Sequence, residues 1–278
     1  MSTSGTTTPP RVSTRKVDPH VKILHTPFNT QPAFSLLKGI PPQRLAGMML
    51  FTGNTVFVLG LAVAESVFPG YSVSRDFISD LGAPIAIPLN PPGILTIHQP
   101  ASIIYVISLS ILTVLSLEAA WQFRQTFPAK KFWKVFFVFA AGLVALPLSY
   151  IPYYVYADQQ IMQPISNVPA LLIAGAIVHD ALSGLVFFFG GLSAVESRKL
   201  VMKPLDRLFP IAGIITISAA VLSGVGVNLG LGPGGIERIV AYPILVWALA
   251  FGGYLIGTNV GSVPPLTTGH STSQNSEK

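Results

Sequence analysis

Six long apolar runs constrain this chain more than any other feature of its sequence. Each run holds about 18 or more largely apolar residues, the length at which an α-helix crosses the hydrocarbon core of a bilayer. Charged residues make up only 10% of the chain, against roughly 25% in a soluble domain, so they could not cover a water-exposed surface. The expected spans are residues 45–68, 99–123, 132–155, 168–195, 208–230 and 239–259. The sequence therefore predicts an all-α fold, a polytopic integral membrane protein built as a bundle of six transmembrane helices.

Two tails of different composition flank the apolar runs. Residues 1–43 are basic and rich in Ser, Thr and Pro, and residues 261–278 are again rich in Ser, Thr and Pro, so both are predicted to be disordered. The predicted transmembrane domain covers residues 44–260. Its first apolar run begins near Leu45, too far along the chain for a cleavable signal peptide, so we expect a retained signal-anchor helix. The chain holds no cysteine, which excludes disulfides and thiolate metal sites.

The distribution of Lys and Arg predicts the orientation in the membrane. They gather before the first run, between the second and third, and between the fourth and fifth: Arg11, Arg15, Lys16, Lys22, Lys38, Arg44, Arg124, Lys130, Lys131, Lys134, Arg198, Lys199, Lys203 and Arg207. The three alternate connections hold only Arg75 and Arg238. Because positively charged loops stay in the cytoplasm, we predict a cell-membrane protein with both termini cytoplasmic. The cations then determine topology, and we predict no nucleic-acid partner.

The first outer connection contains the polar stretch "SVSRDFISDLGAP", residues 72–84. A short helix beginning within its first three residues would place Asp76 and Asp80 on one face and Arg75 on another. In one interpretation Arg75 pairs with Asp76 and Asp80 accepts a backbone or serine hydrogen bond, so that the loop is a lid without a ligand. In the alternative interpretation these charges belong to a binding site.

The fourth run contains an ionisable pair in "VHDALSG", His179 and Asp180. Ionisable side chains inside a span are costly and normally face the bundle interior or a water-filled cavity. One interpretation is a neutral histidine that hydrogen-bonds to a neighbouring helix, with Asp180 as its local partner. The other is a role in handling a ligand or a proton.

The last run opens with "GLGPGGIERIVAYP", in which glycines and a proline predict a tight outer turn. Glu237 near a helix N-terminus is favoured by the helix dipole, whereas Arg238 at the same end is disfavoured. An arginine in that position requires a carboxylate partner. We expect the partner to be one of three acidic residues: Asp76, Asp80 or Asp180.

A metal or haem site is the remaining possibility for these polar groups. His98, His179, Asp80, Asp180 and Glu237 have side chains that suit zinc or iron, and two histidines could hold a haem. Nothing in their spacing requires either, so we predict no metal and no cofactor. The chain also lacks a nucleophile elbow, a phosphate-binding loop and a zinc-protease motif.

The quoted motifs resemble a known family. "FPGYSVSRDFISDLGAP", "HDALSGLVFFFGGLSAV" and "GGIERIVAYPILVWALAFGGYL", in this order, are similar to the largely archaeal membrane family "domain of unknown function 998" over residues 45–258. This resemblance implies about six spans and no assigned activity. A weaker likeness links Ile78–Ser79–Asp80 and His179 to the DRAM and Frag-type six-span proteins, some of which are linked to lipid remodelling or membrane trafficking.

We therefore hypothesise an extracytoplasmic polar pocket that binds a lipid headgroup or a small polar ligand, with membrane lipids as partners. The candidate binding residues are Arg75, Asp76, Ser79, Asp80, His179, Asp180, Glu237 and Arg238. Arg75 and Arg238 would face an anion. One alternative is an enzyme that modifies lipids or lipid-linked glycans, with Asp80 or His179 as the catalytic base. Another is a structural subunit whose polar cluster only holds helices together.

Overall fold

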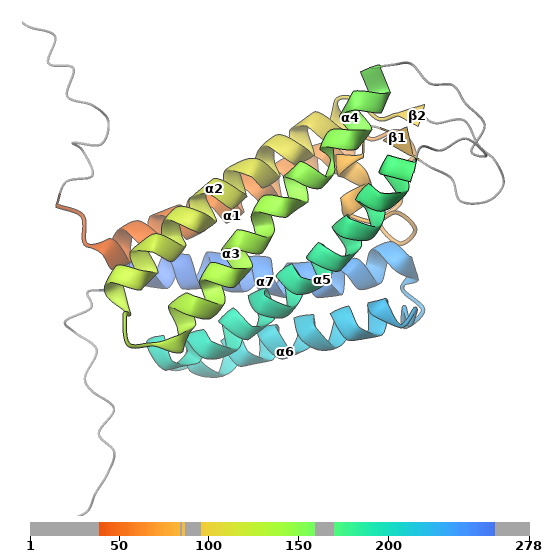
Figure 1. Cartoon of the computed structure of the whole chain (residues 1–278). Helices are drawn as coiled ribbons and strands as arrows, with labels where there is room; N and C mark the ends of the chain where they lie inside the picture. Colours follow the sequence, from red (N-terminus) through yellow and green to blue (C-terminus); the bar gives the residue numbers. More distant parts are fainter. Residues whose placement is uncertain (1–38, 84, 87–95, 159–169, 259–278) are drawn as a thin grey trace, which may run out of the picture. The chain divides into compact units, whose positions relative to one another are not determined.

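The computed structural model describes residues 39–83, 85–86, 96–158 and 170–258 (Figure 1). The elements of these residues are α1 (Pro42–Val67), the 3-10 helix η2 (Ser79–Gly82), β1 (Ile85–Ala86), β2 (Thr96–Ile97), α2 (Ala101–Thr126), α3 (Lys131–Ser149), α4 (Ile151–Asp158), α5 (Ala170–Ser197), the 3-10 helix η4 (Arg198–Leu200), α6 (Leu205–Gly224) and α7 (Gly232–Gly257). Apart from the two-residue antiparallel ladder of β1 and β2, all regular structure in the described part is helical. In the described part of the chain six helices are long and apolar enough to cross a membrane, which confirms the predicted architecture.

Proline and glycine residues, which a hydropathy average does not distinguish, set the boundaries of the last two helices. α7 begins at Gly232, seven residues before the predicted start at residue 239, with Pro233 in its first turn. Proline suits that position because its fixed φ is helical and the first N–H groups of a helix have no partner. α6 ends at Gly224, before the predicted end at residue 230, because the chain turns through Gly226 and Gly230, both with φ of +78°. Consequently Glu237 and Arg238 lie within α7 rather than at its opening.

Close contacts between helix backbones organise the bundle. α1 packs against α2 and α7, while α5 packs against α3 and α6. A Cβ added at Gly47 of α1 would lie 2.8 Å from the carbonyl oxygen of Gly252 on α7. Gly191 of α5 and Gly213 of α6 meet in the same way. Small residues allow such approach between membrane helices, so these two pairs fix which helices are neighbours.

The two ends of the bundle differ in what they carry. Gln43 Nε2, at the start of α1, donates to Thr258 Oγ1 at 3.0 Å, just after α7, so both described ends of the chain lie together. We call this the tail end. At the opposite end, called the loop end, Figure 1 shows α4, β1, β2 and the start of α5. The candidate site residues lie at the loop end.

Aromatic side chains fill the tail half of the core. Phe123, Phe132, Phe136 and Phe251 are almost fully buried, with ring centroids of contacting pairs 5.0–5.8 Å apart. Trp247 stacks on Phe251 and donates its Nε1–H to Ser197 Oγ at 2.9 Å. This half is therefore solidly packed by large side chains, and open volume is found nearer the loop end.

Candidate functional site

The first outer loop folds as turns and one short 3-10 helix, so the predicted helix starting near Ser72 is wrong. The Asp76 carboxylate accepts the Ser72 backbone N–H at 2.7 Å and the Arg75 Nε–H at 2.8 Å. Arg75 Nη2 also donates to the Gly70 carbonyl at 2.9 Å. An aspartate that bonds its own local backbone stabilises a turn at the expense of a helix. The Arg75 guanidinium beside Asp76 holds the pKa of that carboxyl below its usual value.

Asp80 has a local role in the same loop. Its Oδ2 accepts the Phe77 backbone N–H at 2.8 Å, next to the start of η2, and its side chain is exposed. Both contacts expected of a lid, Arg75 with Asp76 and Asp80 with backbone, are therefore present.

We use the name Arg238 cluster for this buried guanidinium and the groups that it contacts. They are Glu65 Oε1 (2.6 Å), Tyr71 Oη (2.6 Å), and the carbonyl oxygens of Val73 (2.8 Å), Gly234 (2.9 Å) and Asp76 (3.3 Å). The predicted carboxylate partner, Asp76, Asp80 or Asp180, is wrong, because the ion pair is made with Glu65 of α1. Arg238 is only 5% exposed, so its charge needs this full set of partners. The cluster ties α1, the outer loop and α7 together.

The glycine-rich motif receives the outer loop. The Gly234 N–H donates to the Ser74 carbonyl at 3.0 Å. A Cβ at Gly234 would lie 2.6 Å from the Val73 carbonyl oxygen and would collide with that of Asp76. Gly232 has φ of +78° and lies against Ser74 in the same way. Because these glycines have no side chain, the backbone of the outer loop can lie directly against the start of α7. This close approach brings the loop carbonyls within reach of Arg238.

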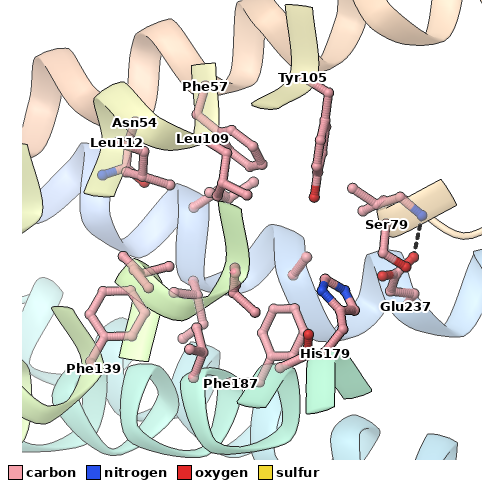
Figure 2. A pocket seen from close by; sticks show the side chains of 18 residues that line it. Asn54, Phe57, Ser79, Tyr105, Leu109, Leu112, Phe139, His179, Phe187 and Glu237 are labelled. Atoms are coloured by element: carbon pink, nitrogen blue, oxygen red, sulfur yellow. Dashed lines mark hydrogen bonds between the residues drawn. The ribbon is translucent and has the colours of Figure 1, made fainter. Parts of the chain in front are cut away.

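A cavity lies beside this cluster, within the helices. It is lined by 18 residues from α1, α2, α3, α5, α7 and the segment at η2, and its empty volume is about 720 Å³ with the open space at its mouth included. Figure 2 shows Phe139, Leu112 and Asn54 toward one end and Ser79, His179 and Glu237 toward the other. The cavity is therefore mainly apolar, with its polar groups concentrated at the loop end.

Glu237 provides the acidic group of the cavity. It follows Ile236 and precedes Arg238 on α7, and its carboxyl accepts backbone N–H groups of Ile78 and Ser79. Residues one position apart on a helix point about 100° apart. Arg238 therefore meets the outer loop at Val73 and Asp76, whereas Glu237 meets it at Ile78 and lines the cavity.

His179 lines the cavity from α5. Its Nδ1 is 2.9 Å from Ser149 Oγ of α3, and its ring lies 5.1 Å from that of Tyr150 between centroids. The predicted hydrogen bond from His179 to a neighbouring helix is thus present. Asp180, which was expected to be the local partner of His179, is exposed and does not make this contact. The His179 side chain therefore presents its second nitrogen, Nε2, away from Ser149.

A pair of tyrosines missed by the sequence analysis completes the polar end. The Tyr150 hydroxyl donates to the Ser79 carbonyl at 3.0 Å, and its ring meets that of Tyr105, which lines the cavity, edge to face with centroids 6.0 Å apart. The ring of Tyr150 packs directly over Gly82, where a Cβ would overlap it. Tyr near the ends of apolar runs was the available signal, but it is common in membrane helices.

The predicted convergence of eight residues is only partly realised. Ser79, His179 and Glu237 line the cavity. The others lie outside its lining: Arg75, Asp76, Asp80, Asp180 and Arg238. Burial lowers the pKa of His98, which stacks on Phe68 with ring centroids 3.9 Å apart rather than joining the cavity. Among the described residues, no group of three His, Asp or Glu side chains could hold a metal ion.

Comparison with known proteins gives one match. The model of a family described as "Protein of unknown function (DUF998)" matches residues 52–254, a range that includes every residue lining the cavity. No curated protein and no solved structure matches the chain.

Proposed function

The chain belongs to the DUF998 family of proteins of unknown function, and we propose that this multi-pass membrane protein binds a lipid in its cavity. The observation that carries the proposal is the gradient along the cavity wall. Apolar side chains such as Leu112 and Phe139 suit a hydrocarbon chain, and the loop-end groups Glu237 and His179 suit a polar headgroup.

We further propose that the loop end faces away from the cytoplasm, in the cell membrane. At the tail end of the described helices lie nine cations: Arg44, Arg124, Lys130, Lys131, Lys134, Arg198, Lys199, Lys203 and Arg207. In the described residues the loop end has Arg75 and Arg238, both paired with carboxylates. This asymmetry supports cytoplasmic termini.

Single cysteines test this orientation directly, because the chain has none. Ser74→Cys, in the outer loop, should react with a membrane-impermeant maleimide in intact cells. Lys130→Cys, between α2 and α3, should react only after permeabilisation. The opposite labelling pattern would contradict the orientation.

Lipid binding is tested by filling the cavity. Ser183→Phe introduces a ring into the lining, whereas Ala181→Phe places the same ring on the exposed face of the same helix. Lipids that co-purify with each variant are extracted and quantified by mass spectrometry. We expect Ser183→Phe to lose at least about 90% of a specific lipid, a tenfold or greater loss of affinity, and Ala181→Phe to retain it. Equal lipid content in the two variants would refute binding in the cavity.

A lipid-modifying enzyme stays as the second candidate because His179 has a nitrogen available in the cavity. Asp80, the other candidate base, does not line the cavity, and its carboxylate accepts the Phe77 backbone N–H. If the protein is an enzyme, His179→Ala should cause an unmodified lipid to accumulate in cells. The structural role considered from the sequence is better supported for the Arg238 cluster than for the cavity.

A further inference from the structure

We infer that the lipid in this cavity presents hydrogen-bond donors, as hydroxyl or ammonium groups, and no phosphate or carboxylate at the polar end. The inference rests on the proposed function and follows from matching donors to acceptors around that end. Each group with a fixed role there has its hydrogens already committed to the protein or has none to offer.

The first group is the Glu237 carboxylate. In its ionised form it offers about four acceptor positions and no donor. The amides of Ile78 and Ser79 occupy two of these positions. The remaining positions accept further hydrogen bonds, and an anionic headgroup beside them would be repelled.

The second group is His179, whose tautomer can be deduced. Ser149 Oγ has a single hydrogen, which it donates to the Leu146 carbonyl at 2.6 Å. The 2.9 Å contact between Ser149 Oγ and His179 Nδ1 must therefore be donated by the ring. In a neutral imidazole with its proton on Nδ1, Nε2 has a free lone pair and acts only as an acceptor.

The Tyr105 hydroxyl also lines the cavity, and its ring meets that of Tyr150 edge to face with centroids 6.0 Å apart. A phenol hydroxyl can donate or accept, so Tyr105 does not restrict the choice of ligand.

No cation in the lining balances these acceptors. The 18 lining residues include neither Lys nor Arg. Arg238 and Arg75, which the sequence suggested as anion-binding groups, are engaged by Glu65 and Asp76 respectively. The hydroxyls of Ser79 and Ser183 can rotate to donate or accept, so they do not restrict the choice. The ligand class that fits is a long-chain or isoprenoid alcohol, or a long-chain amine.

Three probes with the same chain test the inference on the purified full-length protein: hexadecanol, hexadecylamine and hexadecanoic acid. Each is titrated at pH 7.5 against the native protein and Ser183→Phe, and saturable binding is measured by native mass spectrometry. We expect the alcohol or the amine to bind at least about tenfold more tightly than the acid, because the acid leaves the acceptors unmatched. Preference for the amine alone would identify an ammonium group in the ligand. Equal binding of the alcohol and the amine would identify a hydroxyl-type donor.

Variants of the acceptors provide the second arm. Glu237→Gln replaces a carboxylate oxygen by an NH₂ donor of similar shape, so the preference for donor probes over the acid should fall by at least about tenfold. Asp180→Asn removes the same charge next to His179 but on the exposed face, and should leave the preference unchanged. Thermal unfolding of each variant checks that it is folded, and His179→Phe provides a second acceptor deletion.

The outcomes separate the two proposals. If the acid binds as tightly as the alcohol and the amine, and Ser183→Phe abolishes all three, the cavity binds lipids but the inference about the headgroup is wrong. An unchanged preference in both Glu237→Gln and His179→Phe would overturn it equally. If no probe binds in a way that Ser183→Phe reduces, the proposed function itself fails.

Discussion

Glu237 and Arg238 are consecutive residues of α7, yet they belong to two regions with opposite character. The Arg238 cluster satisfies nearly every donor of a buried cation with groups of the protein, although Arg238 Nε has no partner among the described residues. The polar end of the cavity has acceptors that face empty volume instead. A saturated cluster can only stabilise the fold, whereas unmatched acceptors can select a ligand. The comparison therefore assigns structure to one region and binding to the other.

The largest effect should come from breaking the saturated region. Arg238→Ala leaves Glu65 without its partner and releases the carbonyls of the outer loop. Removing one member of a buried ion pair destabilises a protein by about 3–5 kcal/mol, so we expect a loss of folded protein. The amount of folded protein is measured by fluorescence-detected size-exclusion chromatography, and its stability by thermal unfolding in detergent.

Arg75→Ala is the matched control for Arg238→Ala. Its pair with Asp76 is solvent-exposed, with 67% of the arginine side chain accessible, so the variant should unfold near the native temperature. Equal destabilisation by the two substitutions would erase the distinction between the buried cluster and the exposed pair.

A smaller effect is expected where the outer loop meets α7. Gly234→Ala would force a Cβ against the carbonyl oxygens of Val73 and Asp76, and overpacking of this kind costs about 1–3 kcal/mol. Gly253→Ala, on the same helix with nothing within 4 Å, should be neutral or stabilising. If the two variants have the same thermal stability, close approach of the loop does not hold the cluster in place.

Asp80→Ala tests whether Asp80 only stabilises the outer loop or also contributes to lipid binding. It removes the hydrogen bond that the Phe77 amide donates to the Asp80 carboxylate, for which about 1 kcal/mol is expected. Because Asp80 does not line the cavity, the content of bound lipid and the probe preference should not change. Loss of bound lipid without loss of stability would show that Asp80 belongs to the binding site after all.

The smallest effect concerns pH and a buried group on the loop side. Burial lowers the pKa of His98 below its usual value of about 6.5, with the carboxylate of Asp76 opposing the shift, and the His98 Nδ1 atom has no partner among the described residues. As the pH falls below about 6.5, the unfolded chain binds a proton that the folded protein resists, so stability decreases. Thermal unfolding at pH 5.5 and 7.5 should show this decrease in the native protein and less of it in His98→Phe. An identical pH dependence in both would remove His98 as its source.

The candidate site shows how far sequence reasoning reached. Ser79, His179 and Glu237 were identified because ionisable or polar groups in apolar surroundings are conspicuous. Glu65 was visible in the first run as well, and a buried arginine near the same depth could have pointed to it. Ser149, Tyr105 and Tyr150 could not be singled out, since hydroxyl residues are ordinary in membrane helices and their roles depend on which helix lies opposite.

The sequence by itself determined the six helices and the shared end of both described termini, because hydropathy and helix length are local properties of the chain. The tertiary structure decided that Arg238 pairs with Glu65, that His179 meets Ser149, and that Glu237 faces the cavity. These choices depend on the rotation of each helix about its axis and on its depth against its neighbours. Glycine contacts such as Gly47 with Gly252 fix that arrangement only once the helices pack.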